Sequence, residues 1–407
     1  MKKLLIAILV VLLAFAGVTG YYTLKNRPEP AETGEELAVD EGEAELEEGY
    51  GITLRSLDLD ALYALHEPGE IVASVNGRDV TWDEYFYWFS NGAVSVENYM
   101  MQMAFYGQDV NWEDPWGDDP SQSFFDYVFF STEEQIKPFA VIEDLAAEYG
   151  AALDEAAEAD LAAKLAQYRV DSVGEEATDE EYAEYLRGME HMSLETLETL
   201  MRDSALYQAN FTAIYGKDGS LVSDEDTMDF LTEYGYVKAN HILRLTMDMT
   251  TGEDLSEDDA AQKQAEAAAI AAQLQAIEDP EELLARLAEL KETWDEDSGK
   301  VDNPDGYIFA EGEMVQEFYD AARALGEYRV SDPVLSPYGY HVIVRLPLDP
   351  DTVLGYSDAG TEITARAACA NTRYGELLDE RLQQAEFRYA DGFEKPDLTA
   401  YLIEESF

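Results

Sequence analysis

The sequence is poor in cysteine and in basic residues. Cys369 is the one cysteine among 407 residues, so the chain can form neither an intrachain disulfide nor a metal site built from cysteines. Lysine and arginine number 26 against 87 aspartates and glutamates, which gives a formal net charge of −61. A surface of this sign repels nucleic-acid phosphates and anionic lipid head groups, so we expect neither as a partner. It is typical of a strongly solvated exported or salt-adapted protein.

Several motifs of common enzyme classes are also missing. There is no glycine loop for a phosphate, no HExxH pair for zinc and no GxSxG elbow for a nucleophilic serine. The acidic run Asp295–Gly299 hints at a calcium loop, but its fifth position lacks a ligand and Gly306 occupies the twelfth, where a calcium loop needs glutamate. We therefore expect no metal and no cofactor.

The N-terminus is typical of an export signal or a membrane anchor. Lys2 and Lys3 precede the uncharged apolar run Leu4–Gly20. A run of this length lies between a cleaved signal peptide and a short spanning helix, so both interpretations of residues 1–20 stay open. Positive charge before the run predicts that the remaining chain lies outside the cytoplasm. The scarcity of cysteine fits an envelope without dedicated disulfide chemistry, such as that of a Gram-positive bacterium.

An acidic segment follows the apolar run. Ten acidic residues and no basic one lie between Glu29 and Glu48, interrupted by proline and glycine. Such a segment cannot bury a core, so residues 21–67 are predicted to be a disordered linker, with ordered structure beginning near Pro68.

Residues 68–233 are predicted to be mainly helical after a short hairpin. Ile71–Val75 is typical of a strand, and Asn76-Gly77 of a tight turn. Helix-capping patterns then begin at Thr81, Thr178, Ser193 and Ser223. The many aromatic and methionine side chains are expected mainly in the core, although some could line a cleft for a client protein.

Residues 234–349 have a different pattern, which predicts the order β-α-α-β-α-β-β and therefore an α+β fold. After Pro350 the chain is expected to return to a helix, from Thr361 to about Arg388. The elements expected in the α+β segment are strands at 237–245, 307–309, 331–335 and 340–346 and helices at 257–277, 281–292 and 315–325.

The α+β segment resembles the parvulins, a family of peptidyl-prolyl isomerases. The motifs that carry the resemblance are His241-Ile242-Leu243, Asp297-Ser298-Gly299, NPDGYIF at 303–309, GEMVQEF at 312–318 and SPYGYHVI at 336–343. The flanking segments IVASVNGRDVTWDEY (71–85) and EKPDLTAYL (394–402) resemble exported foldases of the PrsA and SurA type. The resemblance implies a parvulin domain inserted into one helical chaperone domain, whose two parts are residues 68–233 and 350–407.

The resemblance also implies a site. Rotation about an X-Pro bond is slow because the amide resists twisting, and a catalyst only has to stabilise the twisted amide. Family positions for an apolar pocket are matched by Phe309, Met314 and Phe318, and those for the polar centre by His241, Asp297, Ser336 and His341. The residues alone leave structural roles open, because a histidine on a strand or an i, i+4 apolar pair on a helix is usually part of the core.

Three functions follow from these observations. The first is a peptidyl-prolyl isomerase and chaperone that acts on unfolded or partly folded secreted proteins with X-Pro bonds. The second is a holdase whose parvulin fold does not catalyse. The third is an acidic, calcium-buffering envelope protein. Retention of both histidines and the apolar trio favours the first, and the calcium-loop spacing disfavours the third.

Export can be tested in cells. Protease added to intact cells should digest this chain, because the positive residues before the apolar run place the rest outside the cytoplasm. Replacing Leu9 and Val10 with charged residues should retain the chain inside, since the apolar run is short. Full protection of the parent chain from the protease would contradict the prediction.

Overall fold

The computed structural model describes residues 53–117, 120–357 and 360–406, and these form two compact units. Unit 1 combines the chain up to residue 214 with residues 374–407, and unit 2 spans residues 215–373. The predicted signal or anchor, residues 1–20, lies outside the described residues, as does the linker up to residue 52. Among the helices of the described ranges, none is long and apolar enough to cross a membrane. The predicted insert, residues 234–349, lies within unit 2, which also holds residues 215–233 and 350–373.

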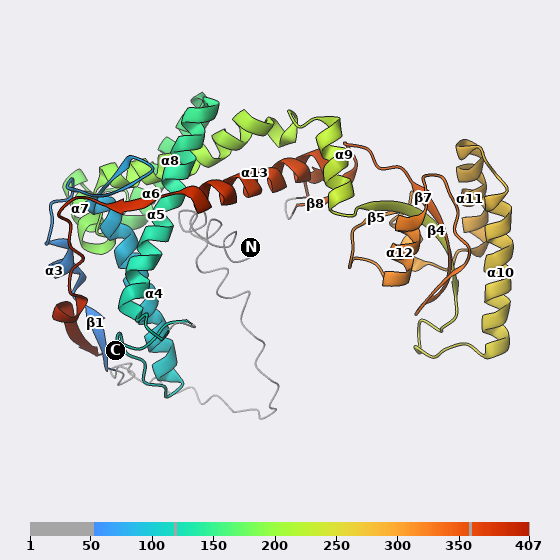
Figure 1. The fold of residues 1–407 in the computed structure, drawn as a ribbon, viewed down its shortest axis with the longest axis horizontal. Coiled ribbons are helices and arrows are strands. Elements are labelled where there is room, and N and C mark those ends of the chain that lie inside the picture. Colours follow the sequence, from blue (N-terminus) through green and yellow to red (C-terminus); the bar gives the residue numbers. More distant parts are fainter. Residues whose placement is uncertain (1–52, 118–119, 358–359, 407) are drawn as a thin grey trace. The chain divides into compact units, whose positions relative to one another are not determined.

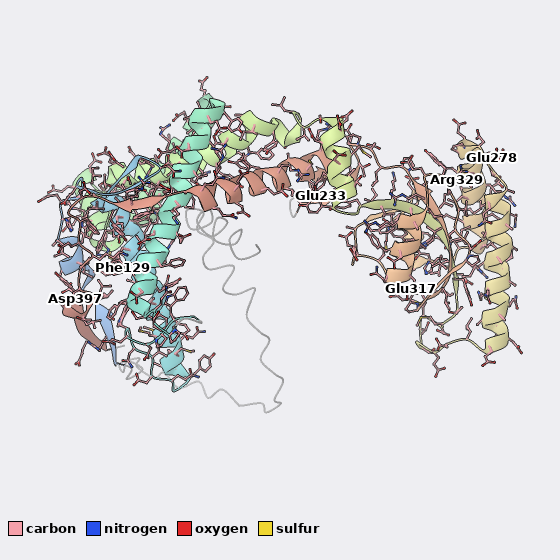
Figure 2. All side chains as sticks on the ribbon, in the orientation of Figure 1. Phe129, Glu233, Glu278, Glu317, Arg329 and Asp397 are labelled. Atoms are coloured by element: carbon pink, nitrogen blue, oxygen red, sulfur yellow. The ribbon has the colours of Figure 1, made fainter. Side chains whose placement is uncertain are left out.

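Unit 1 is mainly helical, as predicted. The expected caps are present: Thr81 Oγ1 accepts a hydrogen bond from the Glu84 backbone N–H at 3.3 Å, and Thr178 forms a reciprocal capping box with Glu181. The elements are α4 (Trp82–Phe105), α5 (Phe124–Tyr149), α6 (Glu155–Val173), α7 (Asp179–Tyr185), the π-helix η1 (Leu186–Glu190) and α8 (Leu194–Tyr215), with Phe129 labelled on α5 in Figure 2.

Strands from the two ends of the chain pair within unit 1. The hairpin of β2 (Ile71–Val75) and β3 (Arg78–Thr81) turns at Asn76 and Gly77, whose φ values are 52° and 94°. Only residues that tolerate a positive φ fit such a turn. The third strand of this sheet is β10 (Phe387–Tyr389), and β1 (Thr53–Leu57) pairs with β11 (Leu402–Ser406). Each pairing joins residues more than 300 positions apart.

These pairings correct two predictions. Ordered structure does not begin near Pro68, because β1 and α3 (Leu59–Tyr63) precede it with Leu57 and Leu62 buried. The closing helix, α13 (Ala365–Gln384), does not reach Arg388, which lies in β10. Local sequence pattern could not show either point, since each short strand is stabilised by a partner at the other end of the chain.

A buried cluster of charged side chains holds the hairpin of unit 1 to its helices. Arg78 on β3 donates from Nη1 to both carboxylate oxygens of Glu84 on α4, at 2.8 and 2.9 Å. Its Nε donates to Glu143 on α5 at 2.6 Å, and its Nη2 lies 3.4 Å from Asp203 on α8. Burial, together with the nearby Glu143, raises the pKa of Asp203 to about 8. One guanidinium therefore contacts three carboxyl groups from three helices.

Unit 2 contains the predicted β-α-α-β-α-β-β order, preceded by α9 (Asp224–Glu233), where Glu233 is labelled in Figure 2. Four of the strands in unit 2 form an antiparallel sheet in the order β5-β4-β7-β6. The strand predicted at residues 331–335 is shorter and begins later, at residues 334–336. The elements are β4 (Val237–Leu245), α10 (Glu257–Gln275), α11 (Pro280–Trp294), β5 (Tyr307–Phe309), α12 (Gln316–Ala324), β6 (Val334–Ser336) and β7 (Gly339–Leu346).

The sheet separates two apolar cores. Helices α10 and α11 cover one face and α12 covers the other (Figure 1). Side chains alternate along the strands, so Ile242 and Val344 pack against α10 and α11, while Ala239 and Ile343 pack beneath α12. After β7, a hairpin of β8 (Val353–Tyr356) and β9 (Glu362–Thr364) stands where the sequence predicted the start of a helix.

The charged cluster of unit 1 makes a stability prediction. Arg78→Ala should lower the free energy of unfolding of unit 1 by about 3 kcal/mol, because it leaves buried carboxyl groups without their cation. Urea unfolding followed by tryptophan fluorescence can measure this, since Trp82, Trp88, Trp112 and Trp116 all lie in unit 1.

Arg202→Ala is the matched control. Arg202 pairs with Glu158 at the surface, so its loss should leave the unfolding midpoint nearly unchanged. Equal shifts for the two variants would show that burial of the Arg78 cluster does not matter.

Candidate active site

A cavity of about 480 Å³ lies on the face of the sheet that α12 covers. His241 on β4 and His341 on β7 form part of its wall, with Phe318 on α12 and Asp297 from the segment after α11. The further residues that line it are Leu243, Leu245, Met249, Glu296, Ser298, Tyr307, Glu313, Met314, Val315 and Tyr338.

Strand register explains why the two histidines meet. His241 is opposite Ile343 and His341 is opposite Leu243 in the antiparallel pair β4–β7, so both side chains point to the same face. Their ring centroids lie 5.1 Å apart, and both residues are buried. Phe318 meets each ring edge-on, at 5.0 Å from His241 and 5.2 Å from His341.

Asp297 orients the first histidine. Its Oδ2 lies 3.1 Å from Nε2 of His241 and accepts a hydrogen bond of 2.5 Å from the Tyr307 hydroxyl, while its Oδ1 accepts one of 3.0 Å from the Gly299 backbone. The hydrogen bond from His241, with those from Tyr307 and Gly299, holds the pKa of Asp297 well below its usual range. An ionised carboxylate only accepts, so the Nε2 of His241 carries the proton that joins them.

Ser336 performs the corresponding role for the second histidine. Its hydroxyl lies 2.7 Å from Nε2 of His341 and accepts a hydrogen bond of 3.2 Å from the Tyr338 backbone. Burial, with a smaller effect of His241, lowers the pKa of His341 to about 3. His341 is therefore a neutral imidazole at physiological pH. The Nδ1 atoms of His241 and His341 are buried and have no hydrogen-bond partner among the residues that the structure describes.

Five of the seven predicted site residues line the cavity, namely His241, Asp297, Met314, Phe318 and His341. The other two stand behind this wall. Phe309 is only 1% exposed and packs on Phe318 with ring centroids 5.5 Å apart, and Ser336 lies behind His341.

Residues 241–346 match the family model of the PPIC-type PPIase domain, described as a rotamase. Unit 2 therefore contains a PPIC-type peptidyl-prolyl isomerase domain. The match covers about a quarter of the chain, and it includes both histidines.

The chain is also similar to curated and solved proteins. Foldase protein PrsA 1 of Bacillus cereus is 46% identical over 56 residues, which are 14% of this chain and 20% of that protein, so the chain matches about a fifth of the length of this relative. The parvulin NmPin of Nitrosopumilus maritimus is 29% identical over 28% of this chain and 96% of that one, with a TM-score of 0.19. The isomerase PrsA from Bacillus cereus is 20% identical over 67% of this chain and 87% of that one, with a TM-score of 0.24.

Sequence reasoning missed several residues of the isomerase domain that line the cavity. Tyr307 lies inside the quoted NPDGYIF motif, and its hydroxyl is the second donor to Asp297. Leu243 and Leu245 follow His241 at a spacing of two along β4, so strand periodicity could have placed them on the same face. Met249 comes from the polar loop after β4, and no pattern in that loop singles it out.

The arrangement suits a reaction in which no covalent bond is made or broken. Apolar side chains can hold a ring in the cavity and keep water away from the adjacent amide. The neutral imidazole of His341 and the hydrogen-bonded one of His241 form a polar floor whose orientation Asp297 and Ser336 maintain. No activated nucleophile is required for twisting an amide.

The buried state of His341 predicts how the stability of the isomerase domain changes with pH. Between the unfolded pKa near 6.5 and the folded pKa of about 3, the unfolded chain binds a proton that the folded domain does not. Stability should therefore fall on acidification through this window, with this one group contributing a slope of up to about 1.4 kcal/mol per pH unit.

Hydrogen exchange of peptides from residues 237–346, corrected for intrinsic rates, should show this slope between pH 6.5 and 4. His341→Gln removes the titrating group, so its slope should be smaller. Asp297 also stabilises the folded domain, but this contribution to stability is lost only below its ordinary pKa near 4. Because both proteins contain Asp297, it does not affect the comparison. Equal slopes for parent and variant would contradict the assignment.

Proposed function

We propose that this chain is an exported peptidyl-prolyl cis/trans isomerase and chaperone, which assists the folding of secreted proteins outside the cytoplasmic membrane. Residues 234–349 would be the catalytic domain, and residues 68–233 with 350–407 the chaperone domain. The observation that carries the proposal is the pair of buried histidines beneath one apolar cavity, with Phe318 edge-on to both rings.

The cavity can act on an X-Pro bond by binding its twisted form better than its planar one. The proline ring would lie against Phe318 and Met314, which removes its apolar surface from water. The amide before proline would then lie over the two imidazoles. A twisted amide loses its resonance, so its nitrogen and carbonyl oxygen need different partners from those of the planar state. Because Asp297 and Ser336 hold the two imidazoles in place, this polar floor needs little rearrangement as the amide twists.

The remaining parts of the proposal concern clients and location. Exposed aromatic side chains occur in two places. At the end of α4, Phe105 is 57% and Tyr106 is 73% exposed, and on α5 Phe130 is exposed as well. Such side chains support binding of unfolded, X-Pro-containing secreted proteins. The name "Foldase" of the Bacillus cereus relative agrees with this role. Residues 1–20 would export the chain or hold it at the membrane, in a bacterium that we infer to be Gram-positive.

Pocket substitutions test catalysis directly. Met314→Ala should lower kcat/KM for a short X-Pro peptide roughly tenfold, because it removes apolar surface equivalent to about 1–2 kcal/mol of binding. His241→Asn should lower it further by breaking the contact with Asp297. A protease-coupled or NMR exchange assay of peptide isomerisation measures both.

Glu317→Gln is the matched control, since Glu317 (labelled in Figure 2) is exposed on α12 beside Phe318. It should retain parental activity. Suppression of client aggregation should persist in all three variants. A parent chain that suppresses aggregation without accelerating isomerisation would instead identify the non-catalytic holdase.

A further inference from the structure

A second cavity, of about 300 Å³, lies in unit 2 near the other end of α12. It shares α12 and β7 with the active site but not the same residues. Arg323 lies five positions after Phe318 on α12, and Arg345 lies four positions after His341 on β7, about 13 Å further along the strand. The lining consists of Met228, Leu231, Thr232, Gly235, Tyr236, Arg323, Glu327, Arg345 and Leu348.

Arg345 is a half-buried arginine on the wall of this cavity. It faces α12 because its register partner is Ala239, which lies in the core beneath that helix. Its Nη1 is buried and has no hydrogen-bond partner, and no ion pair of Arg345 occurs in the part of the chain that the structure describes. Burial lowers the pKa of its guanidinium, and the charge of Glu327 opposes this effect in part. The nearest acidic residue on the cavity wall, Glu327, forms no ion pair with it.

A second guanidinium lines the same cavity. Arg323 donates from Nη1 to the Tyr319 hydroxyl at 3.1 Å, and that hydroxyl donates to the Gly235 backbone carbonyl at 3.0 Å. The Tyr319 hydroxyl is a neutral acceptor, and the exposed side chain of Arg323 forms no ion pair within the described residues. Two arginines thus line one cavity with a single carboxylate on its wall.

This concentration of positive charge is unusual in a chain with 87 acidic and 26 basic residues. Several arginines elsewhere in the described chain have carboxylate partners: Arg244 pairs with Glu266 and Glu296, and Arg78 pairs with Glu84. The buried Nη1 of Arg345, which has no hydrogen-bond partner among the described residues, costs folding free energy. Packing alone does not require it, since a methionine fills similar space without the charge.

We propose that Arg323 and Arg345 bind the C-terminal carboxylate of a peptide whose last side chain is apolar. A planar guanidinium matches a carboxylate with two parallel hydrogen bonds. Met228, Leu231 and Leu348 provide an apolar wall beside the arginines. In a C-terminal residue the carboxylate and the side chain leave the same Cα, so both fit a cavity of about 300 Å³. When the carboxylate instead belongs to an internal aspartate or glutamate, the nearest apolar side chain starts from the next Cα, about 3.8 Å away. This inference does not depend on isomerase activity.

Calorimetry on the full chain at low salt tests the ligand class with peptides that lack proline. Acetyl-Ala-Ala-Leu with a free carboxylate should bind at least tenfold more tightly than its C-terminal amide. It should also bind more tightly than acetyl-Ala-Glu-Leu amide and inorganic phosphate. Equal binding of the free acid and the amide would overturn the proposal. Equal binding of the internal glutamate peptide or of phosphate would overturn the assignment to a chain terminus.

Variants test the residues. Arg345→Met should weaken binding of the free acid at least tenfold, while the unfolding midpoint of the peptide-free protein stays the same or rises, because an unpaired charge is removed. Arg329→Gln is the matched control: Arg329, labelled in Figure 2, lies outside the cavity lining, and its loss should leave affinity unchanged. Glu327→Gln should tighten binding two- to threefold by removing like charge. A lower midpoint for Arg345→Met, or unchanged affinity, would show that Arg345 has an internal partner and would overturn the proposal.

Discussion

Antiparallel pairing of β4 with β7 determines which side chains α12 covers. Residues opposite each other in the register share a face, and every second pair faces α12. His241 with Ile343 and Leu243 with His341 are two such successive pairs. A shift of one residue in the register of either strand would move its histidine to the face that α10 and α11 cover. The apolar residues of both cores oppose this shift, because it would bring polar side chains into them.

Polar groups on this face differ in how far other residues satisfy their hydrogen bonds and charge. Asp297 is ionised and accepts from His241, Tyr307 and the Gly299 backbone. His341 is neutral and contacts Ser336. At the far end of the face, Arg345 is charged, and its buried Nη1 has no hydrogen-bond partner within the described residues. Groups with all their hydrogen bonds formed stabilise one conformation. The histidine Nδ1 atoms and Nη1 of Arg345 lack hydrogen bonds within the described residues, and their burial costs free energy. Such costs are typical of sites that meet a ligand.

Unit 1 depends on pairing between distant parts of the chain. The β2–β3 hairpin is local, but its sheet is completed by β10, and β1 is completed by β11. Unit 2 is inserted between the two parts of unit 1, and the chain leaves unit 1 through α8 and returns to it through α13. The long-range strand pairs can therefore form on either side of the insertion. The Arg78 cluster adds a second long-range link, since its carboxyl partners come from α4, α5 and α8.

Several features were determined by the sequence itself. Turn chemistry at Asn76-Gly77, caps at Thr81 and Thr178, and strand alternation around His241 predicted their elements because each depends on neighbours a few positions away. The quoted motifs placed five residues on one cavity. Only the tertiary structure decided that Phe309 and Ser336 support this wall from behind and that Tyr307 and Met249 belong to it. Only the tertiary structure paired β1 with β11 and left Nη1 of Arg345 without a hydrogen-bond partner among the described residues. These outcomes depend on which distant segments pack together, and local pattern carries no information about such contacts.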